Sequence, residues 1–203
     1  MALNFAVNNS LSAVTALPAS ISGGGLNLIS TQTASSSSTI SFTSGIDSTY
    51  KEYIFKFINV HPATSDASFT FNMSVDGGSN YNVTKTTTTP RAYHDEADSE
   101  AAIEYDGGQD LAQSTSFQGI SRFLGNGNDE CGSGTLHIFD PSSTTFVKHF
   151  IAVANTYYSG DYSFNDFTAG YGNTTSAVNA VQFKMSSGNI DAGTIKMYGI
   201  KDS

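Results

Sequence analysis

The sequence predicts an all-β protein, an antiparallel, jelly-roll-like β-sandwich with an extended N-terminal arm. Strand-forming residues are frequent, since the 203 residues include 14 Phe and 10 Tyr beside abundant Thr, while good helix formers are scarce. Short segments of alternating apolar and polar residues recur along the chain, separated by Gly, Asn, Asp or Pro. The length is sufficient to bury one full core.

Residues 1–25 are predicted to form the arm, and residues 26–203 the sandwich domain. The arm carries spaced apolar residues and ends in three consecutive glycines, which would serve as a hinge. It is either a free tail or a segment held against a neighbouring subunit or partner protein. In the second case we expect Leu3, Phe5 and Val7 to make the docking contacts.

The first half of the domain should begin with strands at 26–31 and 39–43, separated by a Ser-rich loop or exposed edge. Residues 50–60 (YKEYIFKFINV) have the strongest strand pattern, and Pro62 should end that strand because proline cannot continue a hydrogen-bonded ladder. Residues 67–75 (ASFTFNMSV) alternate regularly, which predicts a strand with one buried face.

The middle of the chain is harder to assign. The polar segment 81–89 is expected at a sheet edge, where Lys85 and Pro90 would prevent pairing with another sheet. Residues 91–130 contain a dense acidic stretch. Within them, residues 113–124 fit either a short helix or an irregular strand.

The last third returns to a clear strand pattern at 135–139, 145–156 and 162–171. Two further alternating segments, 181–185 and 194–200, flank turn residues that include Gly188 and Asn189. We expect these two segments to form an antiparallel hairpin that pairs with early strands and closes the sandwich. The total would be roughly eight or nine strands, as in sandwich and jelly-roll folds.

The charge of the chain excludes several partners. Nine Lys and Arg against 18 Asp and Glu give a formal net charge of −9. Because an acidic surface repels phosphate groups, we expect neither nucleic acid nor a membrane as a partner. No segment approaches the ~20 apolar residues of a membrane span, and the first residues lack the basic start of a signal peptide. Synthesis in a cytoplasm is therefore expected.

Candidate metal sites are weak. The acidic residues between 95 and 106 could attract a divalent cation, but they lack the spacing of a calcium-binding loop, so a solvated acidic loop is favoured. Residues 126–130 fit a turn better than a cation site. The four histidines have no short metal-ligand spacing, although two of them could face each other across a hairpin. These two are His137 and His149.

Catalytic motifs are also missing from the sequence. It contains no GxSxG, GxGxxG or phosphate-binding loop motif. Cys131, the single cysteine, cannot form an internal disulfide, and the adjacent Asp129 and Glu130 disfavour its thiolate. Trp, the usual platform for sugars, is absent, although Tyr could replace it. We therefore expect no catalytic residue, no cofactor and no metal, and we expect that the protein is not an enzyme.

Two segments carry a resemblance to a known family. They are STQTASSSSTISFTSGIDSTYKEYIFKFINVHPAT near the start and FKMSSGNIDAGTIKMYGIK at the end. The chain resembles virion proteins of tailed bacteriophages, common in phages of marine bacteria and cyanobacteria, over roughly Leu26 to Lys201. In that family a closing SSG.I..GTI.LYGIK hairpin completes a jelly-roll-like sandwich, and Met197 stands here where leucine is more usual. The resemblance implies a structural virion protein that forms homotrimers or other homo-oligomers.

These observations predict a non-enzymatic structural protein of a bacteriophage particle. The first hypothesis is a capsid decoration (cement) or head-fibre protein whose arm docks on the major capsid protein, because the chain has room for one sandwich and an anchor. The alternative is a tail-fibre or receptor-binding module that recognises host surface glycans through Tyr157, Tyr158 and Tyr162. A hydrolase that uses the acidic residues of 95–106 is a third, weaker hypothesis.

Overall fold

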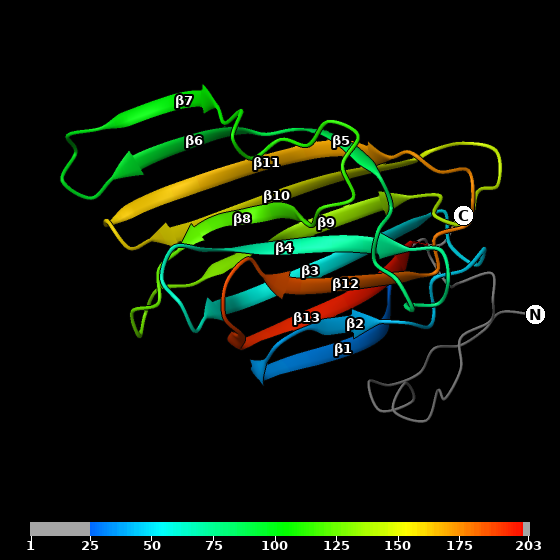
Figure 1. Cartoon of the computed structure of the whole chain (residues 1–203). Coiled ribbons are helices and arrows are strands. Elements are labelled where there is room, and N and C mark those ends of the chain that lie inside the picture. Colours follow the sequence, from blue (N-terminus) through cyan, green and yellow to red (C-terminus); the bar gives the residue numbers. More distant parts are fainter. Residues whose placement is uncertain (1–24, 201–203) are drawn as a thin grey trace, which may run out of the picture.

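The computed structural model describes residues 25–200, and all regular secondary structure in this range is β-strand (Figure 1). The strands pair antiparallel in one network that folds into two facing layers, which confirms the predicted sandwich. There are more strands than the pattern predicted, chiefly because the acidic region contributes a hairpin. The thirteen strands are β1 Leu26–Ser37, β2 Ile40–Phe42, β3 Glu52–Pro62, β4 Ala67–Ser74, β5 Lys85–Thr88, β6 Pro90–Asp95, β7 Ala101–Tyr105, β8 Gln118–Leu124, β9 Gly132–Phe139, β10 Lys148–Tyr158, β11 Tyr162–Gly172, β12 Ala180–Met185 and β13 Ile190–Ile200.

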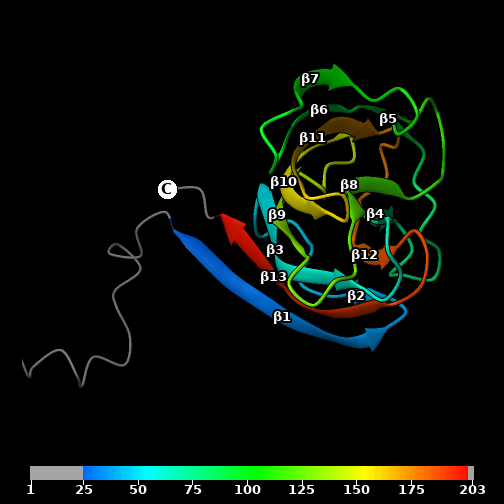
Figure 2. The same ribbon diagram turned by 90° about the vertical axis from the view of Figure 1, so that its left-hand side faces the viewer.

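The two layers differ in width. The long layer has the order β1-β13-β3-β9-β10-β11, and β5, β6 and β7 extend it beyond β11. The short layer has the order β8-β4-β12-β2. A single pairing between Tyr158 of β10 and Leu124 of β8 joins the layers. Figure 2 shows the strands of both layers surrounding the common core in an end-on view.

The closing segment seals the sandwich, but it does so as an arch and not as the predicted hairpin. β12 pairs with β2 and β4 in the short layer, whereas β13 pairs with β1 and β3 in the long layer. The connecting turn crosses between the layers, where Gly188 has a φ of 70° and the Ser186 amide donates to the Ser68 carbonyl. Phe183 and Met197 therefore approach the same core from opposite sides.

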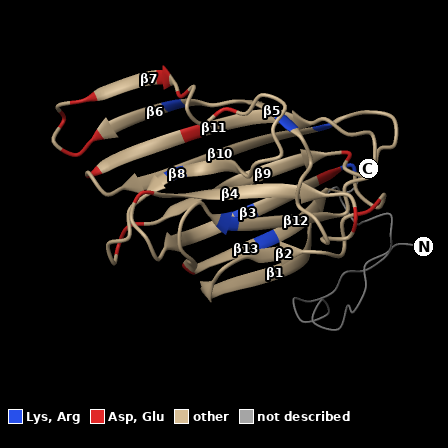
Figure 3. Cartoon of the chain, in the orientation of Figure 1, with Lys and Arg blue, Asp and Glu red and all other residues tan. Residues whose placement is uncertain are grey.

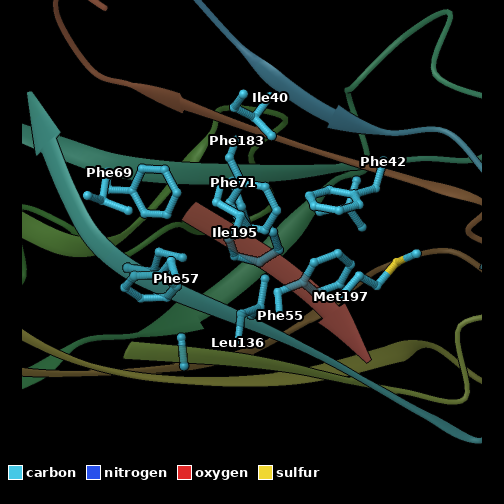
Figure 4. Close-up of a cluster of buried hydrophobic side chains, with 14 of the residues drawn as sticks. Ile40, Phe42, Phe55, Phe57, Phe69, Phe71, Leu136, Phe183, Ile195 and Met197 are labelled. Atoms are coloured by element: carbon cyan, nitrogen blue, oxygen red, sulfur yellow. The ribbon is translucent and has the colours of Figure 1, made fainter. Parts of the chain in front are cut away.

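Aromatic side chains dominate that core (Figure 4). Phe69 and Phe183 of the short layer stack with ring centroids 5.4 Å apart, and Phe55 of the long layer packs against Phe183 at the same distance. Tyr53, Phe55 and Phe57 are all buried, as the alternation in the segment 50–60 predicts. Each such ring removes a large apolar area from water, so the core supplies most of the driving force for folding.

β4 differs from its prediction, because both of its faces are buried. Its polar side chains lie under the loops that connect β4 with β5 and β7 with β8. The Asn72 amide, for example, donates to the carbonyl oxygens of Tyr81 and Thr115, at 2.7 and 2.9 Å. Alternation shows which face of a strand meets the main core, but it does not show that a loop covers the other face.

Lys85 does not lie at an exposed sheet edge, where the sequence predicts it. β5 is not a free edge, because β11 pairs with one side of it and the backbone of Leu111 and Ser114 with the other. The Lys85 side chain is completely buried, and its ammonium donates to Asn72 Oδ1 at 2.6 Å. Residues 113–124, whose sequence fits either a short helix or an irregular strand, contain the strand β8.

Candidate functional site

The outward surface of β5, β9, β10 and β11 forms the first candidate site, and we call it the uncharged face. β10 alternates strictly from Lys148 to Thr156, so its even-numbered residues point into the core and its odd-numbered residues point outward. The register places the outward residues of β9 and β11 beside them. None of the outward residues on these four strands is Asp, Glu, Lys or Arg. They are Thr86, Thr88, Ser133, Thr135, His137, Phe139, His149, Ile151, Val153, Asn155, Tyr157, Ser163, Asn165, Phe167, Ala169 and Tyr171.

Large apolar side chains occupy the centre of the uncharged face. Val153 lies opposite Phe167 in the β10–β11 ladder, and Ile151 lies opposite Ala169. Ile151, Val153 and Phe167 remain 48%, 37% and 42% exposed, respectively. In Figure 3 most of β10 and β11 carries no charge colour, while acidic colour gathers around the β6–β7 hairpin and the loops. Asp166, the charged residue in the middle of β11, points inward and is buried.

One end of the uncharged face is hollowed. A depression of about 500 Å³ is lined by residues that include Phe139, His149 and Tyr171. A second depression of about 490 Å³ shares Phe139 and His149 and is bordered by Phe146. The Phe146 side chain is 70% exposed, so a large ring projects beside two apolar hollows.

The three tyrosines of the predicted glycan site lie on different sides of the sheet. Tyr158 and Tyr162 flank the β10–β11 turn, with ring centroids 5.8 Å apart, and Tyr158 stacks on Phe164 at 5.1 Å. Tyr93 and Phe123 complete this aromatic cluster. Its rings are packed against one another and only partly exposed.

Tyr157 points to the other side of the sheet, toward the uncharged face. Its hydroxyl donates to Asp161 Oδ1 at 3.0 Å, and this hydrogen bond raises the pKa of Tyr157 to about 12. The Tyr162 hydroxyl donates to Glu100 Oε2 at 2.9 Å, which raises its pKa as well. The three tyrosines therefore do not form one continuous ligand surface.

The acidic residues of 95–106 lie mostly on the β6–β7 hairpin and have partners within the chain. Arg91 pairs with Glu104 at 2.6 Å, and Asp106 lies between Arg91 and Arg122. Asp95 accepts hydrogen bonds from the Ser99 hydroxyl and from the backbone amides of Glu100 and Ser99, which hold its pKa below the usual range. Within residues 25–200 no group of three or more His, Cys, Asp or Glu is placed to hold a metal ion.

The histidine pair suggested by the sequence does not form. His137 lies opposite Ile151, and its Nδ1 atom is 2.6 Å from Glu52 Oε1. The ring of His149 instead packs against Tyr171. Both rings belong to the uncharged face, but each contacts a different neighbour.

A buried ion pair, Arg122 with Asp166, joins the two layers, and no sequence motif predicts it. Arg122 of β8 and Asp166 of β11 are both completely buried, and Arg122 Nε donates to Asp166 Oδ1 at 2.7 Å. Burial raises the pKa of Asp166, against the lowering effect of the Arg122 charge. The only sequence signal is a charged residue inside each strand pattern, ISRFL and SFNDF.

A polar depression of about 450 Å³ lies beside Asn59, His61, Glu130, Cys131 and Asp191. Glu130 Oε2 accepts a hydrogen bond from the Gly127 amide, which fixes the loop. Burial, together with the charge of Asp129, raises the pKa of the Cys131 thiol. The thiolate is therefore disfavoured, in agreement with the sequence-based expectation for this cysteine.

The proposed docking residues Leu3, Phe5 and Val7 lie outside the described residues. In the described part of the chain there is no helical segment that could cross a membrane. Comparison of the chain with protein-family models, with curated proteins and with solved structures found no match.

Proposed function

We propose that this chain is a non-enzymatic structural protein of a bacteriophage particle, a capsid decoration (cement) or head-fibre protein. The observation that carries this proposal is the uncharged face. A contiguous exposed apolar surface on a folded protein is typical of an interaction site. Here it lies on a sheet whose inner side is anchored in a rigid aromatic core, as an assembly surface requires.

The arm is the proposed connection to the particle. In this proposal residues 1–25 dock on the major capsid protein through Leu3, Phe5 and Val7, and the sandwich faces outward. Such a protein stabilises a shell because it buries additional surface between neighbouring capsid subunits. The resemblance to tailed-phage virion proteins supports the same assignment and implies a homotrimer or another homo-oligomer.

Protein mass spectrometry of gradient-purified particles tests the proposal. The particles should come from the phage whose genome encodes the chain. A decoration protein should co-purify with intact particles in a fixed ratio to the major capsid protein. Presence only in the soluble fraction of the infected-cell lysate would contradict a role in the particle.

The alternative is a tail-fibre module that binds host surface glycans, and the aromatic cluster at the β10–β11 turn favours it. Tyr158 and Tyr162 offer partly exposed rings on which a sugar could stack. Replacing each tyrosine by Ala should then reduce phage adsorption and glycan-array binding. Unchanged adsorption by folded variants would remove this alternative.

A further inference from the structure

The uncharged face has no cover among the described residues, although large apolar side chains lie at its centre. Ile151, Val153 and Phe167 are each exposed by more than a third; Val153 lies opposite Phe167 in the β10–β11 ladder, and Ile151 is the next outward residue of β10. Single exposed apolar residues are normal on a protein surface, but a contiguous group of them across several strands indicates a partner.

We infer that a second copy of this chain covers the uncharged face. The inference rests on the proposed function, since assembly on a particle brings many copies together, and it names the partner of that surface. Each copy has a formal net charge of −9, so two copies repel each other in most orientations. Contact through a surface without acidic residues minimises this repulsion, and the centres of protein interfaces are depleted in charge.

The area of the uncharged face is close to that of an interface between two copies of the chain. β10 and β11 have 11 residues each, with the shorter β9 and β5 beside them. At ~3.4 Å per residue and ~4.8 Å between strands, the four strands cover on the order of 600 Å². A standard interface buries about 800 Å² on each partner. Loops at the rim, including the one that carries Phe146, supply additional area.

Phe146 is the proposed anchor of the contact. Its ring is 70% exposed and stands beside the two hollows that share Phe139 and His149. Asp140 also borders the second hollow, and its charge is paired with Lys51 at 3.0 Å. Insertion of an aromatic ring into an apolar hollow of the partner is the type of contact that dominates binding energies in interfaces. Each chain thus carries both the projecting Phe146 ring and the apolar hollow that would receive the ring of a second copy.

Sedimentation velocity over a concentration series tests the inference with the full-length protein. The variant Val153→Glu places a charge at the centre of the uncharged face. Its matched control is Val75→Glu, because Val75 has the same 37% exposure but follows β4 in the short layer. Phe146→Ala is a second test variant that leaves every strand intact.

We expect the wild type and Val75→Glu to sediment as oligomers. Val153→Glu should raise the dissociation constant at least about 100-fold, because a buried unpaired carboxylate is strongly disfavoured, and Phe146→Ala should weaken association about 10-fold or more. Circular dichroism and thermal unfolding establish that each variant is folded. If Val153→Glu is unfolded, Phe146→Ala alone decides the result.

A monomeric wild type would overturn the inference, and so would folded variants that associate as tightly as the wild type. These results are separable from the proposed function. A monomer that still co-purifies with particles would refute self-association through this face alone. An oligomer that is absent from particles would refute the particle role and leave the interface standing.

Discussion

Replacing Lys85 with methionine tests the buried polar network beneath β4. The Lys85 ammonium is completely buried and donates to Asn72 Oδ1 and to the Val83 carbonyl, at 2.6 and 2.8 Å. No carboxylate pairs with it within the described residues. Burial therefore lowers the pKa of Lys85 to about 7, from an ordinary value of 10.5.

This shift makes stability depend on pH with a definite sign. Between pH 7 and 10.5 the unfolded chain keeps the Lys85 proton while the folded chain has lost it. The unfolded state then binds more protons, so the free energy of unfolding rises with pH by up to ~1.4 kcal/mol per unit. Between pH 7 and pH 9 the contribution of Lys85 is about 2 kcal/mol. Lys85→Met removes it.

Urea denaturation at pH 7, 8 and 9 provides the assay. Other titrating groups, including the buried Lys148, are common to both proteins and cancel in the difference. We expect the wild type to gain about 2 kcal/mol relative to Lys85→Met between pH 7 and pH 9. Parallel stability profiles of the two proteins would refute the reasoning, because Lys85 would then titrate alike in the folded and unfolded states.

Three further changes test the core, the ion pair and the arm. Phe183→Ala should cost about 3–5 kcal/mol in urea denaturation, because it leaves a cavity among packed aromatic rings. Arg122→Met should cost a similar ~3–5 kcal/mol, since Asp166 would remain buried without its partner; a loss below about 1 kcal/mol for either variant would contradict its assigned role. Deletion of residues 1–25 should leave thermal unfolding of the sandwich nearly unchanged and abolish binding to particles. Wild-type occupancy by the truncated protein would contradict docking through the arm.

The strands with one apolar face could be predicted from the sequence. In β3 the residues that meet the core, Tyr53, Phe55 and Phe57, lie where the pattern placed them, because a period of two assigns each side chain to a face. In β11 only Phe164 of the apolar residues faces the core, whereas Phe167 points outward and Asp166 points inward. Which strands pair with each other could not be predicted in this way. β12 and β13 are consecutive and separated by a turn, yet they lie in different layers, since alternation is the same for a hairpin and for an arch.

The candidate sites, too, could be predicted from the sequence only in part. Proximity of Tyr158 and Tyr162 follows from the short turn between them, and this local feature can be read from the sequence. The uncharged face depends on register between four strands that span residues 85–172, and both faces of β10 carry apolar residues. The sequence pattern alone therefore did not reveal which apolar residues are exposed. Burial of Arg122 with Asp166 likewise depends on a contact between the two layers.

Immunogold electron microscopy of intact particles tests the central claim most directly. An antibody raised against residues 26–203 reports where the sandwich is displayed. We expect gold distributed over the head, as for a decoration or head-fibre protein. Gold confined to the tail would contradict that assignment in favour of the glycan-binding alternative. Absence of label from both intact and gently disrupted particles would contradict a role in the particle altogether.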